Sequence, residues 1–224
     1  MSKFPYDIVL FDLDGTLVES HYDLANAVNH ALELEGRAPM PAAELRQKIG
    51  GGAVRMLKRA LEAQGGMVDE ARFDILKAAL LDHYWAHIAD NTLPFAGCVA
   101  ALEALIERGC TLAVCTNKNE GPSRSLLDTL GMSRLFKTVY GADTLGIERA
   151  KPKPDMLLAA ARDCGGGRFA MIGDSNYDTS AARAAEASVV AVSFGYSDIP
   201  LSELDCDAMI DHYDELIPTL ERIG

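Results

Sequence analysis

Two aspartates separated by one residue, Asp12 and Asp14, follow the apolar run Ile8–Phe11 and precede Gly15. Two carboxylates this close repel each other by about 4 kcal/mol at ~4 Å and an effective dielectric constant of ~20. A divalent cation bound to the carboxylate oxygens would offset that repulsion. The alternative is that either aspartate only caps the turn that the glycine permits. The pair therefore favours a reaction centre with a metal ion at the end of a strand, with a simple turn as the alternative.

Three further polar sets occur later in the chain. Thr116 and Asn117 directly follow an apolar run, where a hydroxyl and an amide suit phosphoryl oxygens or simply form a turn. Lys151 lies in a stiff Lys-Pro-Lys-Pro segment and would be a fixed cation, although an isolated lysine is more often solvated. Asp174 ends another apolar run, and Asp178 falls in the first turn of the next helix, where an acidic residue also serves as a cap.

Short apolar runs alternate with helical patterns along most of the chain. Their continuous hydrophobicity is typical of strands covered on both faces in a parallel sheet. We expect strands over residues 7–11, 111–115, 138–140, 169–172 and 189–192. We expect helices over residues 97–108, 123–130, 154–163, 177–187 and 214–222. This alternation predicts an α/β fold with a doubly wound parallel sheet, a Rossmann-like core.

One long segment departs from this alternation, because helical patterns follow one another there without a strand between them. The expected helices cover residues 23–35, 42–49, 53–64 and 70–89. We therefore divide the chain into an α/β catalytic core, residues 1–18 and 91–224, and an inserted all-helical cap, residues 19–90. Ligands of open α/β sheets bind outside the carboxyl ends of the strands, so the cap is expected to act as a lid.

Composition limits the partners. The chain has 224 residues and a formal net charge of −12, which disfavours a general role in binding nucleic acid or an anionic membrane. No apolar stretch approaches the ~20 residues that span a bilayer, and the first residues lack a signal-peptide pattern. The five cysteines have no metal-type spacing. We expect a cytoplasmic protein with reduced thiols, whose oligomeric state the sequence leaves open.

Together and in this order, the polar sets resemble the four motifs of the haloacid dehalogenase-like phosphatase superfamily, and the resemblance covers essentially the whole chain. Asp12–Thr16 matches the first motif, Thr116 the second and Lys151 the third, while Asp174 and Asp178 match the fourth. Within the superfamily the chain is similar to phosphoglycolate phosphatases with a helical cap. The softer marks of that subfamily are residues 50–53, 114–118, 141–144 and 193–196.

The resemblance implies a role for each acidic residue. Asp12 would attack phosphorus and form an aspartyl phosphate, and Asp14 would protonate the leaving alkoxide and then activate water. A Mg²⁺ ion would be bound by Asp12, by the backbone carbonyl of Asp14 and by Asp174. Asp178 would complete this metal site by orienting a metal-bound water or Lys151.

The resemblance also implies residues that contact substrate. Lys151 would offset charge on the nucleophile and the phosphoryl group, and Thr116, with Asn117, would donate hydrogen bonds to the phosphoryl oxygens. In the cap, Gly51 belongs to a glycine run before a helix, which suits either an anion cradle of backbone N–H groups or a hinge. Arg55, one turn further on, is a candidate for binding a substrate carboxylate.

The expected substrate is a small phosphorylated metabolite, and the subfamily resemblance favours 2-phosphoglycolate. Another phosphate ester (a sugar phosphate or a nucleotide), pyrophosphate, and a sugar-phosphate mutase activity stay open as alternatives. A haloacid dehalogenase is disfavoured because it lacks the second carboxylate that Asp14 supplies. A receiver-like signalling module is disfavoured because receivers are shorter and have no cap.

Other possible sites fit less well. No cysteine has an arginine six residues later, which excludes a cysteine-based phosphatase by spacing. His83 and His87 lie four residues apart on an expected helix, but Tyr84 replaces the glutamate of a zinc-protease motif. We therefore expect packing or surface roles for these two histidines.

Overall fold

The computed structural model describes residues 4–46, 48–49 and 52–224. The chain forms two compact units, one of Met1–Glu19 with Pro94–Gly224 and one of Ser20–Leu93. The sequence-based boundaries fall after residues 18 and 90. Among the described residues, no helix combines the length and the apolar character needed to cross a membrane.

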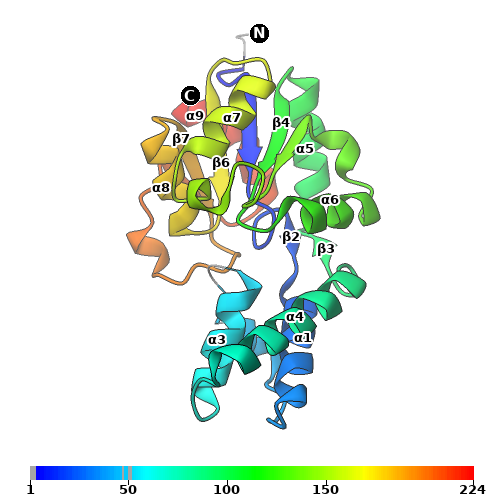
Figure 1. The fold of residues 1–224 in the computed structure, drawn as a ribbon. Helices are drawn as coiled ribbons and strands as arrows, with labels where there is room; N and C mark the ends of the chain where they lie inside the picture. Colours follow the sequence, from blue (N-terminus) through cyan, green and yellow to red (C-terminus); the bar gives the residue numbers. More distant parts are fainter. Residues whose placement is uncertain (1–3, 47, 50–51) are drawn as a thin grey trace. The chain divides into compact units, whose positions relative to one another are not determined.

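The first unit is built on a sheet of six strands in the order β5-β4-β1-β6-β7-β8 (Figure 1). Every neighbouring pair is parallel. The strands are β1 (Ile8–Phe11), β4 (Thr111–Cys115), β5 (Thr138–Tyr140), β6 (Phe169–Gly173), β7 (Ser188–Val192) and β8 (Ala208–Ile210). Because the chain moves outward from β1 in both directions, the predicted doubly wound parallel sheet is confirmed.

Helices connect the strands and pack on the sheet. They are α5 (Cys98–Glu107), α6 (Glu120–Thr129), α7 (Asp155–Asp163), α8 (Asn176–Ala184) and α9 (Leu216–Ile223). α5 and α6 connect strands that follow one another in one direction across the sheet, and α7 and α8 connect strands in the opposite direction. Because such crossovers are right-handed, α5 and α6 lie on one face of the sheet and α7 and α8 on the other. Four short 3-10 turns complete the unit at Ser133–Leu135, Ile147–Arg149, Leu201–Glu203 and Tyr213–Glu215.

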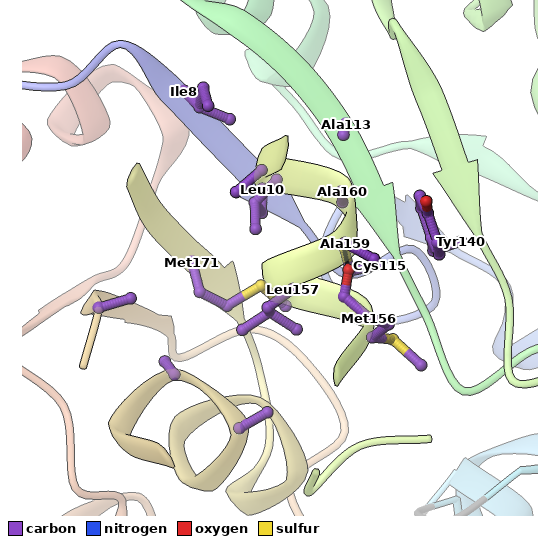
Figure 2. Close-up of a cluster of buried hydrophobic side chains, with 14 of the residues drawn as sticks. Ile8, Leu10, Ala113, Cys115, Tyr140, Met156, Leu157, Ala159, Ala160 and Met171 are labelled. Carbon is purple, nitrogen blue, oxygen red and sulfur yellow. Dashed lines mark hydrogen bonds between the residues drawn. The ribbon is translucent and has the colours of Figure 1, made fainter. Parts of the chain in front are cut away.

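Buried hydrophobic side chains form a cluster between α7 and the sheet (Figure 2). Ile8 and Leu10 are two residues apart on β1 and belong to the same buried cluster, in which Leu10 lies beside Met171 of β6. The small side chains of Ala159 and Ala160 let α7 approach the sheet closely. Each fully buried aliphatic side chain of this kind contributes roughly 1.5–3 kcal/mol, so the carboxyl ends of the strands are held on a stable base.

The second unit is helical. It contains α1 (His21–Leu34), α2 (Ala42–Arg46), α3 (Ala53–Ala63) and α4 (Glu70–Ala86). Asp69 starts α4, because its carboxylate accepts a hydrogen bond from the backbone N–H of Arg72 at 2.9 Å. Buried Asp23 ties α1 to the end of the unit, accepting from the hydroxyl of Thr92 at 2.7 Å. The predicted helical insertion is thus confirmed.

Several details differ from the sequence-based expectation, among them the ends of α4 and α8, which stop three residues earlier than expected. Val18–Glu19 (β2) and Leu93–Pro94 (β3) pair in a separate two-stranded sheet that was not predicted, and strand β8 was also missed. β2 and β3, of two residues each, are too short to show a hydrophobic period. Helix α6 begins at Glu120 instead of residue 123. Pro122 can lie in its first turn because the N–H groups there have no partner within the helix, so the N–H that proline lacks costs no hydrogen bond.

Candidate active site

Neighbouring strands bring polar residues to one edge of the sheet. β1 lies between β4 and β6, so the residues that follow these strands, Asp12, Thr116 and Asp174, emerge side by side. The backbone N–H of Asp12 still donates to the carbonyl of Ile172 at 2.9 Å, which extends the pairing one residue beyond β1. This hydrogen bond fixes the backbone position of Asp12 independently of its side-chain contacts.

Lys151 is buried among carboxylates. Its ammonium lies 3.1 Å from Oδ1 of Asp12 and 2.5 Å from Oδ1 of Asp178, with 1% of its side chain exposed. Asn117 donates from Nδ2 to the backbone carbonyl of Lys151 at 2.9 Å. This amide holds the turn that carries the lysine, while a direct role of Asn117 in binding substrate stays a prediction.

Asp178 has two structural tasks. Its Oδ2 accepts hydrogen bonds from the backbone N–H and the hydroxyl of Ser175, at 3.1 and 2.7 Å, in a capping box that starts α8. Its Oδ1 binds Lys151. A side chain on Gly173 would overlap the Asp178 carboxylate, so the glycine at the end of β6 is required for this packing.

Asp174 is held by the loops that follow β1 and β7. Its Oδ2 accepts a hydrogen bond from the backbone N–H of Tyr196 at 2.6 Å. Gly15 has φ +82°, and a Cβ there would overlap Asp174 and Tyr196; a Cβ on Gly195 would also overlap Asp174. These two glycines let the loops after β1 and β7 close around one carboxylate, and the sequence analysis missed their role.

Burial and neighbouring charges shift the pKa values of Asp12, Asp174 and Lys151. Desolvation raises the pKa of Asp12 to about 6 despite the attraction of Lys151, and repulsion from Asp178 adds to the rise. Desolvation, with repulsion from Asp178 and Asp12, raises the pKa of Asp174 well above its usual value. Burial alone would lower the pKa of Lys151, but the neighbouring Asp12 and Asp178 raise it overall. One lysine thus faces three carboxylates, of which Asp174 and Asp178 are buried, and negative charge is left in excess.

That excess charge suits a metal ion. Asp12, Asp174 and Asp178 each offer an oxygen, and these atoms lie within 4.8 Å of one another. Hard divalent cations bind carboxylate oxygens of this kind, and a bound cation would offset the repulsion that raises both pKa values. The donor set therefore fits a metal ion such as the one the sequence suggested.

Asp14 lies apart from this cluster and has its own cation. Nζ of Lys118 lies 3.1 Å from Oδ1 and 2.9 Å from Oδ2 of Asp14. The two side chains are 9% and 20% exposed. The backbone N–H of Lys118 also donates to Oγ1 of Thr116 at 3.2 Å. Sequence reasoning gave Lys118 no role, although its position two residues after Thr116 was a usable signal.

The other predicted substrate contacts belong to the helical unit. Gly51 lies outside the described residues. Arg55 lies on α3 and is exposed. Their roles in binding substrate stay predictions.

The cysteines are unsuited to nucleophilic attack. All five are free thiols. Burial raises the pKa of Cys98 to about 12 and that of Cys115, at the end of β4, even further. A thiol must lose its proton to attack, so the carboxylate of Asp12 is the better nucleophile at this edge of the sheet.

Comparison with known proteins identifies the family. Residues 6–186 match the family model of the haloacid dehalogenase-like hydrolases. The chain belongs to that family. Among curated proteins, the phosphoglycolate phosphatase of Agrobacterium fabrum is 38% identical over 215 residues, which cover 95% of this chain and 91% of that protein. The phosphoglycolate phosphatase of Caulobacter vibrioides is 40% identical over 207 residues, or 92% of this chain and 86% of that protein.

Solved structures agree with this assignment. A structure from Haemophilus somnus, described as a predicted phosphoglycolate phosphatase, matches with a TM-score of 0.88 at 28% identity. The match covers 97% of this chain and 98% of that one. This haloacid dehalogenase-like hydrolase is thus a phosphatase-type enzyme similar to phosphoglycolate phosphatases, and its aspartate cluster can hold a metal ion.

Proposed function

We propose that the enzyme hydrolyses 2-phosphoglycolate with Mg²⁺ as cofactor and an aspartyl phosphate as intermediate. The observation that carries the proposal is the buried contact of Asp12 with Lys151 beside Asp174 and Asp178. The phosphoryl group carries negative charge throughout its transfer, so catalysis depends mainly on positioning and charge neutralisation. A fixed carboxylate, a fixed ammonium and a cluster of metal-binding oxygens supply both.

Asp12 is the nucleophile in this proposal. Its Oδ1 accepts from Nζ of Lys151 and, at 2.7 Å, from the backbone N–H of Leu13, and these contacts fix the carboxylate that attacks. A bond forms from Asp12 to phosphorus as the bond from phosphorus to the ester oxygen breaks. The covalent intermediate divides one difficult hydrolysis into two easier steps. Lys151 and the hydroxyl of Thr116 bind the phosphoryl oxygens in both steps.

Asp14 moves the protons. Its protonated carboxyl gives a proton to the leaving alkoxide, and the resulting carboxylate then takes a proton from the attacking water. Water bonds to phosphorus, inorganic phosphate leaves, and Asp12 is restored as a carboxylate. Lys118, bonded to both oxygens of Asp14, orients this group.

The metal ligands follow from the acidic cluster. Asp12, Asp174 and the backbone carbonyl of Asp14 would hold Mg²⁺, while Asp178 completes the acidic cluster and keeps Lys151 in place. When bound, the ion neutralises charge on the nucleophile and on the transferred phosphoryl group.

The relatives and Lys118 together support 2-phosphoglycolate. Relatives at 38% and 40% identity over most of the chain are phosphoglycolate phosphatases. In this substrate a single methylene separates the carboxylate from the ester oxygen, so the carboxylate lies close to the group that protonates that oxygen. Once Asp14 carries the proton it will donate, the ammonium of Lys118 can pair with the substrate carboxylate instead.

The test is release of inorganic phosphate from 2-phosphoglycolate, a sugar phosphate, a nucleoside monophosphate and pyrophosphate, with Mg²⁺ and with EDTA. We expect turnover that needs Mg²⁺, favours 2-phosphoglycolate and disappears in Asp12→Asn. Asp155→Asn is the matched control, because that side chain is 39% exposed on α7. Equal, slow turnover of every ester would contradict the substrate, and no release from any ester would contradict the hydrolase.

A further inference from the structure

Three histidines, which we call the histidine row, come together within the helical unit. The ring of His30 on α1 stacks on that of His83 on α4, with centroids 4.5 Å apart and planes 17° apart. The ring of His87, directly after α4, lies 4.5 Å from that of His83. Three imidazoles in succession exceed what packing of two helices requires.

The row lines a pocket that also contains carboxylates. Its volume is about 380 Å³, and Glu33 and Asp90 face it together with the three histidines. Asn29 borders the same pocket, but its amide already bonds both backbone groups of Met40, so it is committed to structure. Asn26 also lines the pocket, so imidazole nitrogens, carboxylate oxygens and one amide are the groups that face a ligand there.

The surroundings of His83 and of His87 suit a metal ion. Burial, with repulsion from His30 and His87, lowers the pKa of His83, which keeps this ring neutral. Nδ1 of His87 lies 2.7 Å from Oδ2 of Asp90. A carboxylate on one ring nitrogen fixes the tautomer and makes the other nitrogen a better metal ligand.

The helix geometry supports shared binding. His83 and His87 are four residues apart, and the backbone N–H of His87 donates to the carbonyl of His83 at 3.1 Å, so one full helical turn separates them. Side chains at this spacing lie on the same face of a helix. α1 packs along α4 and supplies the third ring from the neighbouring helix.

We propose that His30, His83 and His87 form a second metal site, for a divalent transition-metal ion such as Zn²⁺, which links α1 to α4. Glu33 supplies the fourth ligand, while Asp90 keeps its hydrogen bond to His87. Among the described residues, only the aspartate cluster has three ligand atoms within 4.8 Å of one another. The nitrogens of the three histidines are farther apart, so the imidazole rings must rotate out of their stacked orientation to bind one ion. Nitrogen ligands select zinc-type ions, whereas the aspartate cluster offers only oxygens and suits Mg²⁺.

The test is a Co²⁺ titration followed by visible absorption, because nitrogen-bound Co²⁺ absorbs differently from the hydrated ion. The protein is Asp12→Asn/Asp174→Asn, which weakens the catalytic cluster, and the same titration on wild-type protein in excess Mg²⁺ needs no catalytic variant. We expect one equivalent of Co²⁺ to bind, and Zn²⁺ to displace it. We also expect Zn²⁺ to raise the unfolding temperature of both proteins.

Single substitutions locate the site. Asp90→Asn should weaken Co²⁺ binding about 10- to 100-fold, and His30→Gln or His83→Gln should weaken it further. His212→Gln is the matched control, because His212 also pairs with an aspartate, Asp214 at 2.8 Å, but lies in the other unit. Absence of a Co²⁺ spectrum, or a spectrum unchanged in the His30 and His83 variants, would overturn the proposal. Neither result bears on the phosphatase assignment.

Discussion

Nζ of Lys118 contacts both carboxylate oxygens of Asp14, at 2.9 and 3.1 Å, across 104 residues of sequence. The lysine follows β4 and the aspartate follows β1, so the contact joins two neighbouring strand ends. Asp14 therefore has a cation of its own, separate from the Lys151 that serves Asp12 and Asp178.

Because of its contact with Asp14, Lys118 is the first residue to substitute. Lys118→Met should lower kcat/KM for 2-phosphoglycolate about 10²- to 10³-fold, because it removes a charged partner of both Asp14 and the leaving group. The loss should be much smaller for p-nitrophenyl phosphate, whose leaving group needs no proton and has no carboxylate. Lys153→Met, at an exposed lysine near Lys151, is the control. Equal losses on the two substrates would argue against this role.

Asp14→Asn tests the acid and base directly. The amide cannot donate the required proton, so kcat with 2-phosphoglycolate should fall about 10²- to 10⁴-fold. With p-nitrophenyl phosphate the first step should survive, and phosphoenzyme should accumulate because water is no longer activated. Rapid-quench kinetics measure both effects. A loss of the same size in formation of the phosphoenzyme from both substrates would contradict the assignment.

Gly15→Ala tests the packing around Asp174. Its Cβ would overlap Asp174 and Tyr196 at a backbone φ of +82°, so Asp174 must move. We expect a clear rise in the Mg²⁺ concentration required for half-maximal activity. Gly131→Ala is the matched control, since it has φ +69° but open space around it, and carries only a strain of about 1 kcal/mol. A metal requirement that rises equally in both variants would point to general destabilisation.

The raised pKa of Asp12 predicts how stability depends on pH in EDTA. Folding raises that pKa from 3.8 to about 6, so the folded state binds more protons than the unfolded state between these values. Metal-free wild-type protein therefore loses stability as pH rises from 4 to 7. Asp12→Asn lacks this loss. The free energy of unfolding of the variant minus that of wild type should therefore increase by roughly 3 kcal/mol as pH rises from 4 to 7. Chemical denaturation of both proteins across this range measures the difference, and a constant difference would contradict the prediction.

Much of the architecture could be predicted because it follows from patterns along the chain. β1, β4 and β6 are continuous apolar runs, and their order in an α/β sheet brings Asp12, Thr116 and Asp174 to one edge. Lys151 could be placed there only through the family resemblance, since a lysine that precedes a proline gives no burial signal of its own.

Other contacts depend on side-chain directions that no local pattern records. The bond from Lys118 to Asp14 requires both strand ends to be placed first, and the bond from Tyr196 to Asp174 depends on a loop after β7. Strand β8 is three residues long and carries little hydrophobic period. The histidine row was missed for a related reason, because His30 comes beside His83 only through the packing of α1 on α4.

The central claim is that Asp12 becomes phosphorylated. The direct measurement is acid quench of Asp14→Asn during reaction with p-nitrophenyl phosphate and Mg²⁺, followed by borohydride reduction and peptide mass spectrometry. The account predicts that an acyl phosphate forms and that reduction converts Asp12, and no other aspartate, to homoserine. Steady release of p-nitrophenol without a modified Asp12, or a modification at another residue, would contradict it.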